Sequence, residues 1–118
     1  MGLDPEILTT LVARSAQDKK AHDIVILNLK ELSAITDYFV ICSGESDLHV
    51  RAIASQIIED LEEKGEEAWH VEGDSSASWI LIDFVDVVVH VFNHKMREYY
   101  ALERLWGDAP MQTVKSAE

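Results

Sequence analysis

The segment from Trp79 to Phe92 is the densest apolar run in this chain, and two aspartates, Asp83 and Asp86, interrupt it. Both halves of the run are short and rich in β-branched and aromatic residues, a composition that favours β-strands. Polar residues between two such halves are typical of a tight turn. The segment therefore predicts an antiparallel hairpin, and we expect the rest of the chain to be organised around it.

The side chains of this hairpin divide into two different faces. A two-residue loop at Phe84-Val85 would place Trp79 opposite His90, and directly opposed residues share a face. One face is aliphatic and consists of Ile80, Ile82, Val87, Val89 and Val91. The other, which we call the mixed face, consists of Trp79, Leu81, Asp83, Asp86, Val88, His90 and Phe92. The aliphatic face suits covering helices, and the mixed face suits contact with another molecule.

Three helices and three further strands are predicted from capping residues and apolar periodicity. The helices span about 5–19, 47–64 and 94–106, and the strands span about 23–29, 38–42 and 68–71. Asp4 is a capping residue for the first helix, Ser46 or Asp47 for the second, and Asn93 for the third. One stripe of the third helix consists of Met96, Tyr99, Leu102 and Trp106.

The resulting order, α-β-β-α-β-β-β-α, predicts one α/β domain over residues 1–107 with a mixed five-stranded sheet. Residues 108–118 are expected to form a flexible tail. No membrane-spanning helix or signal peptide is expected, because the chain has no 18-residue apolar run and no basic and apolar N-terminal regions. The single cysteine, Cys42, cannot form an intrachain disulfide, which fits a reducing cytoplasm.

The formal net charge of −12 limits the partners that this chain can have. Phosphate groups would be repelled, so direct binding to nucleic acid is not expected. A basic protein is a compatible partner, although solubility alone also accounts for the charge.

The sequence contains no arrangement that points to catalysis, a cofactor or a metal ion. Ser43-Gly44 could cradle a phosphate, but Glu45 and Asp47 would repel one, so we interpret the segment as a strand-to-helix turn. No two carboxylates are spaced i, i+2 on a predicted strand, as a Mg²⁺ site for nucleotidyl transfer would need. The histidines lack a clustered set of metal ligands, and Cys42 lies inside an apolar strand, as a core residue does.

Trp79 and Tyr100 are the candidates for exposed aromatic residues. Trp79 is on the mixed face, and Tyr100 lies off the apolar stripe of the last helix. Exposed tryptophan, tyrosine and arginine side chains are the usual anchors of protein interfaces. A core position for Trp79 is an equal alternative on pattern alone.

Several blocks of this sequence, in the same order, resemble the ribosomal silencing factor family, whose members are also called Iojap-type proteins. The blocks are Ile35–Gly44, Ser46, His49-Val50, Ala52–Ala54, Glu72-Gly73, Trp79, Asp86–Phe92, Arg97–Tyr100, Leu102-Glu103 and Leu105-Trp106. The resemblance runs from about Lys20 to Asp108. The family usually has Gly where this chain has Val85, which bears on the turn because a β-branched residue resists a positive φ.

The resemblance implies a non-enzymatic repressor of translation. Members of the family bind the fourteenth protein of the large ribosomal subunit and prevent the small subunit from joining when nutrients are short. Their fold is similar to a nucleotidyltransferase core without the catalytic carboxylates, which agrees with the lack of a carboxylate pair on the predicted strands.

With this resemblance, the mixed face and the last helix are expected to dock on a basic ribosomal protein. The expected partner-binding residues are Trp79, Leu81, Asp83, Glu72, Asp74, His90, Arg97 and Tyr100. Trp79 and Leu81 would form the apolar anchor, the carboxylates would meet lysine or arginine, and Tyr100 and Arg97 would supply the rim. Two other classes stay open: an enzyme with a nucleotide pocket near Ser43-Gly44, and a homodimer that uses the mixed face on itself.

Overall fold

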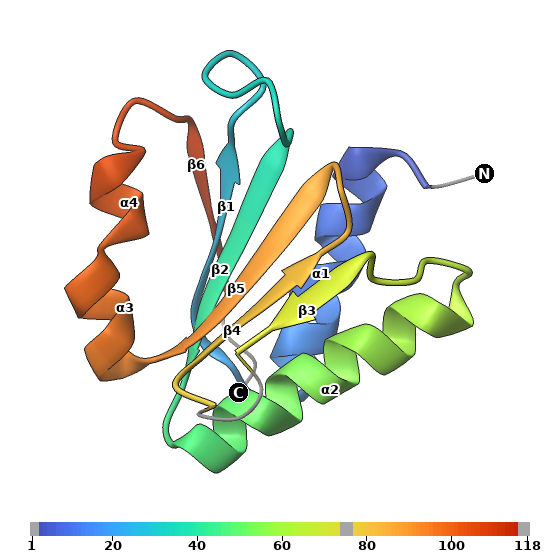
Figure 1. Ribbon diagram of the computed structural model, residues 1–118, viewed down its shortest axis with the longest axis vertical. Helices are drawn as coiled ribbons and strands as arrows, with labels where there is room; N and C mark the ends of the chain where they lie inside the picture. The colour runs from blue at the N-terminus through green and yellow to red at the C-terminus, as the bar shows by residue number, and fades with distance from the viewer. Residues whose placement is uncertain (1–2, 74–76, 116–118) are drawn as a thin grey trace.

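A computed structural model describes residues 3–73 and 77–115 of the chain (Figure 1). The helices are α1 (Pro5–Asp18), α2 (Asp47–Glu63), α3 (His94–Tyr100) and α4 (Leu102–Leu105). The strands are β1 (His22–Asn28), β2 (Tyr38–Gly44), β3 (His70–Glu72), β4 (Trp79–Asp83), β5 (Val87–Asn93) and β6 (Met111–Val114). None of the helices in these described ranges is long and apolar enough to span a membrane.

The strands form one mixed sheet with the order β3-β4-β5-β2-β1-β6. The β2–β5 pair is parallel, and the other neighbouring strands are antiparallel. Figure 1 shows α1 and α2 on one side of the sheet and α3 and α4 on the other. The predicted α/β architecture is therefore confirmed, with one strand more than expected.

The helices begin at the residues whose side chains can cap them. The Asp4 carboxylate accepts a hydrogen bond from the Glu6 N–H, and Pro5 takes the first turn, where a missing N–H is harmless. At α2 the capping residue is Ser46, whose hydroxyl oxygen accepts from the His49 N–H. The side-chain oxygen of Asn93 caps α3. These short-range interactions explain why the starts of the helices were predictable.

The β4–β5 hairpin has a different register from the predicted one. Trp79 lies opposite Phe92 rather than His90, and Leu81 lies opposite His90. The two-residue loop is accordingly Val85-Asp86, because the Phe84 N–H still donates to the Val87 carbonyl oxygen at 2.8 Å. The prediction was wrong by two residues, a slip that leaves every strand side chain on its predicted face because side chains alternate with a period of two.

The two faces pack against different sets of helices. The aliphatic face of the hairpin is buried in the larger core cluster, which includes side chains of α1 and α2. A smaller cluster on the opposite side of the sheet contains Leu27, Ile41 and Phe92, with Leu102 and Trp106 packed against it. The mixed face of the hairpin therefore lies on the side of α3 and α4.

The end of the chain differs from the prediction in two ways. Instead of one helix over 94–106, the chain breaks at Ala101, which has a left-handed φ of 47°. The break turns Leu102 and Trp106 toward the sheet, whereas Tyr99, expected on the same stripe, is 76% exposed. The segment expected to be a flexible tail contains β6, which pairs with β1 and covers an edge that would otherwise expose unpaired backbone groups.

The hairpin loop holds Val85 in a conformation that valine disfavours. Val85 has a φ of 77°, and the Asp86 N–H donates to the Phe84 carbonyl oxygen at 3.0 Å across it. The Asp83 carboxylate supports this turn by accepting from the Val85 N–H at 2.7 Å. Because the Val85 side chain is exposed, little packing offsets the strain of a β-branched residue at positive φ.

We predict that Val85→Gly stabilises the protein, by about 1 kcal/mol, because glycine adopts this φ without strain and the gain exceeds its extra entropy in the unfolded chain. The measurement is the midpoint of denaturant unfolding. Val85→Ala is the control, since it shortens the side chain but keeps a Cβ at positive φ. A Val85→Gly variant no more stable than Val85→Ala would contradict the assignment of strain to this turn.

Candidate protein-binding face

The side of the sheet that carries the mixed face of the hairpin is covered by helices over only part of its width. Within the described ranges, α3 and α4 pack over the β1, β2 and β5 side of this face, as Figure 1 shows, and they meet β4 at Trp79, which Tyr100 of α3 contacts. The side chains that end up partly exposed there come from three strands: Phe39, Trp79, Leu81, Asp83 and Val88. We call these five residues the open face.

The open face combines predicted residues with one that the sequence analysis missed. Trp79, Leu81 and Asp83 lie side by side on β4, as the alternation of the hairpin required. Phe39 joins them because β2 pairs with β5 in a register that places Phe39 beside Val88. The sequence contains no local signal for this parallel pairing, and so it could not place Phe39.

An aromatic group forms one end of the open face. The Trp79 ring lies 5.3 Å from its cross-strand partner Phe92 and 4.5 Å from Tyr100 of α3, measured between ring centroids. Tyr100 is 42% exposed, so the pair joins the sheet to the helix at the surface. Trp79 itself is half-buried. Its exposure is therefore intermediate between the two positions that the sequence left open, an exposed interface residue and a core residue.

Below Trp79 lies a buried histidine. The Trp79 Nε1–H donates a hydrogen bond to His90 Nδ1 at 3.2 Å, and His90 is only 4% exposed. His90 Nε2 has no hydrogen-bond partner among the residues that the structure describes. Burial lowers the pKa of His90 from 6.5 to about 4, because the charged imidazolium would lose its hydration there. The ring is therefore neutral at physiological pH.

Carboxylates border the open face on the side of β3. Glu72 lies opposite Leu81, and His70 lies opposite Asp83, so both β3 side chains share the face of Leu81 and Asp83. The Glu72 carboxylate lies 2.7 Å from His70 Nε2, within hydrogen-bond distance. Asp74, the third expected carboxylate, lies outside the described residues.

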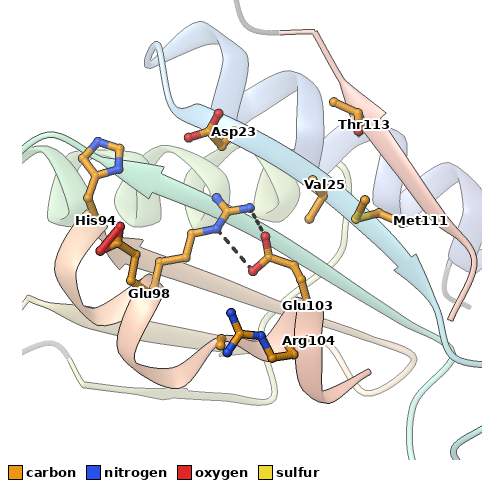
Figure 2. A pocket seen from close by; sticks show the side chains of 10 residues that line it. Asp23, Val25, His94, Glu98, Glu103, Arg104, Met111 and Thr113 are labelled. Atoms are coloured by element: carbon orange, nitrogen blue, oxygen red, sulfur yellow. Dashed lines mark hydrogen bonds and ion pairs between the residues drawn. The ribbon is translucent and has the colours of Figure 1, made fainter. Parts of the chain in front are cut away.

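Arg97 is not at the rim, the position expected for it from the sequence. It is only 9% exposed, and its Nη1 donates to the Ser43 hydroxyl oxygen at 2.9 Å. Its Nη2 and Nε donate to the Glu103 carboxylate, the ion pair marked by dashed lines in Figure 2. Arg97 thus ties α3 to α4 and β2. The prediction failed because a continuous helix would have placed positions 97 and 103 on different sides.

The same ion pair lines a cavity of about 770 Å³ between α3, α4 and the β1–β6 edge (Figure 2). Asp23, His94, Glu98 and Arg104 also line the cavity, so acidic and basic side chains are mixed around it. This mixture favours no single ligand charge. In the part of the chain that the structure describes, no group of three or more histidine, cysteine or acidic residues could hold a metal ion.

Packing accounts for the glycine of the Ser43-Gly44 turn. A Cβ at Gly44 would lie 2.9 Å from the Val50 backbone nitrogen, so a larger residue would push α2 away from β2. Two backbone N–H groups at this turn already have acceptors within the chain. The His49 N–H donates to the Ser46 hydroxyl oxygen, and the Glu45 N–H donates to His49 Nδ1 at 2.9 Å.

The neighbouring Cys42 is buried, which raises the pKa of its thiol to about 12 and disfavours the nucleophilic thiolate.

His90 makes the stability of the protein depend on pH in a predictable direction. Well above pH 6.5 the imidazole is neutral in both the folded and the unfolded states. As the pH falls from 6.5 to about 4, His90 binds a proton in the unfolded state but stays neutral in the folded state. The free energy of unfolding therefore falls progressively over this range. A pKa change of this size corresponds to roughly 3 kcal/mol.

We predict that His90→Phe, which cannot be protonated, loses less stability than the wild type between pH 7 and pH 4. Denaturant unfolding at several pH values measures the difference between the two proteins, which should grow in favour of His90→Phe as the pH falls. A difference that stays constant over this range would contradict the low pKa of His90.

Comparison with known proteins assigns the chain to a family. The sequence model of the family described as "Ribosomal silencing factor during starvation" matches residues 4–118. A Bacillus subtilis protein named ribosomal silencing factor RsfS is 43% identical over 109 residues, 92% of each chain. The Halalkalibacterium halodurans protein of that name is 48% identical over 103 residues, 87% of this chain and 88% of its own.

Solved structures agree with the sequence comparisons. A crystal structure of a Chromobacterium violaceum protein superimposes with a TM-score of 0.87 at 30% identity, covering 98% of this chain and 96% of that one. The fold and the sequence thus lead to the same assignment. The chain belongs to the ribosomal silencing factor family.

Proposed function

We propose that this protein represses translation by binding the large ribosomal subunit and keeping the small subunit from joining it when nutrients are short. The contact is with the fourteenth protein of the large subunit, and it is made by the open face together with Tyr100. Membership of a family whose description names silencing during starvation supports the regulatory role. The chemistry of the open face supports the mode of binding.

The observation that carries this proposal is the incompletely covered apolar part of the mixed face. Trp79, Leu81, Val88 and Phe39 stay partly exposed on the sheet. The C-terminal segment covers this part only incompletely, with Tyr100 packed against Trp79 and Trp106 against Phe39. An aromatic and aliphatic centre bordered by charged groups is the usual arrangement of a protein-binding hot spot. Glu72 and Asp83 provide the charged border on the side of β3 and β4.

Charge favours a basic partner. The chain carries a formal net charge of −12, so it attracts positively charged proteins at a distance and repels exposed RNA phosphates. Glu72 and Asp83 next to the apolar centre would pair with lysine or arginine side chains of a ribosomal protein. The same charge keeps the factor from binding ribosomal RNA without specificity.

The size of the molecule suffices for a steric block. Its principal dimensions are 33 × 32 × 29 Å, so a molecule docked by one face extends about 30 Å from the surface that it covers. A rigid domain of this thickness on the joining surface would separate the two subunits without any chemical step. Repression then requires only that the factor stays bound.

We predict that Trp79→Ala weakens co-sedimentation with purified large subunits, by roughly 2–4 kcal/mol of binding free energy, because truncation removes the aromatic anchor. The matched control is Trp69→Ala. Trp69 is 74% exposed and belongs to neither apolar cluster, so its loss should leave sedimentation unchanged. Thermal unfolding of both variants checks that they are folded.

Equal sedimentation of Trp79→Ala and wild type would refute the assignment of the anchor. Failure of the wild type to bind large subunits, or normal joining of subunits in its presence, would refute the proposed function itself. A homodimer through the same face, the other occupant considered from the sequence, would appear in light scattering as a doubled mass that falls in Trp79→Ala.

A further inference from the structure

We infer that His90 is a positioning residue for the docking anchor: its Nδ1 holds the Trp79 indole in the orientation that the partner binds, while His90 itself touches no partner. This inference rests on the proposed function, because it concerns the same face. It changes the role of His90 from the contact residue expected from the sequence to a support one layer below the contact.

The register of the hairpin explains how the two side chains meet. Trp79 lies directly opposite Phe92, and His90 lies opposite Leu81, so Trp79 and His90 are diagonal neighbours across the two strands. Only long side chains reach a diagonal neighbour. The Trp79 indole does so, and its plane is inclined 22° to the Phe92 ring and 28° to the His90 ring.

The hydrogen bond selects one orientation of this indole. A half-buried tryptophan on an open sheet has several rotamers available, and stacking alone does not distinguish an indole from its flipped form. The bond from Trp79 Nε1–H to His90 Nδ1, 3.2 Å long, is compatible with one of them. Tyr100 packs against the indole with ring centroids 4.5 Å apart, so this contact depends on the same orientation.

The free nitrogen of His90 indicates that the histidine is not there for stability. Since Nδ1 accepts from Trp79, the proton of the neutral ring must be on Nε2. That N–H is buried and lacks an acceptor within the described ranges, an arrangement that costs free energy. An apolar ring at position 90 would avoid this cost in a face that already holds Phe39 and Phe92. What an apolar ring would lack is the acceptor for Trp79.

Burial excludes His90 from direct contact with a docked protein. Its side chain is almost completely covered, and the Phe39 ring stands against it edge-on with centroids 4.5 Å apart. A partner lying on the open face would meet Trp79, Leu81 and Phe39 before it reached His90. Any effect of position 90 on binding must therefore be transmitted through the side chains above it.

A matched pair of amide substitutions tests the inference. In His90→Asn the side-chain oxygen takes the place of Nδ1 and can still accept from Trp79, whereas in His90→Gln the amide reaches the place of Nε2 and leaves Nδ1 without a replacement. We expect His90→Gln to bind large subunits roughly tenfold more weakly than His90→Asn, the effect of about one hydrogen bond. Equal affinities of the two variants, or tighter binding by His90→Gln, would overturn the inference.

A measurement on the free wild-type protein tests the geometry without any substitution. Long-range ¹H–¹⁵N spectra of the histidine rings should show an unprotonated Nδ1 and a protonated Nε2 at His90, with a coupling from Nδ1 to Trp79 Nε1 across the hydrogen bond. A protonated Nδ1 would overturn the inference even if the wild type binds large subunits. A wild type that shows the coupling but does not bind would instead refute the proposed function, and the role of His90 in docking with it.

Discussion

The parallel pairing of β2 with β5 is the contact on which both faces of the sheet depend. It places Val40 beside Val89 and Cys42 beside Val91, which extends the aliphatic face of the hairpin into a layer wide enough for α1 and α2. On the other side the same register brings Phe39 next to Val88. The core and the open face are thus two consequences of one strand pairing.

The open face exists because the C-terminal helices are short. The chain turns at Ala101, and the Arg97–Glu103 ion pair holds the two short helices together over the β1 and β2 side of the sheet. This partly buried ion pair thus helps to fix where the two helices lie, although Arg97 is not at the rim itself.

Local and periodic signals account for what the sequence predicted. Capping residues such as Asp4 and Asn93 determine where helices start, and alternation places Trp79, Leu81 and Asp83 on one face whatever the exact register. Long-range contacts account for what it missed. The pairing of β6 with β1 and the burial of Arg97 depend on partners far along the chain or across a helix break. Alternation also predicts which face of the sheet His90 lies on, but not how deeply its side chain is buried. Burial is what distinguishes a residue that touches a partner from one that positions the residue above it.

The central claim is that the open face is the surface that meets the large subunit. Hydroxyl-radical footprinting of the protein, free and bound to purified large subunits, tests it within one sample because the chain has tryptophans on and off this face. The account predicts that oxidation of Trp79 and Tyr100 falls on binding while oxidation of exposed Trp69 is unchanged. Protection of Trp69 with undiminished oxidation of Trp79 would contradict it.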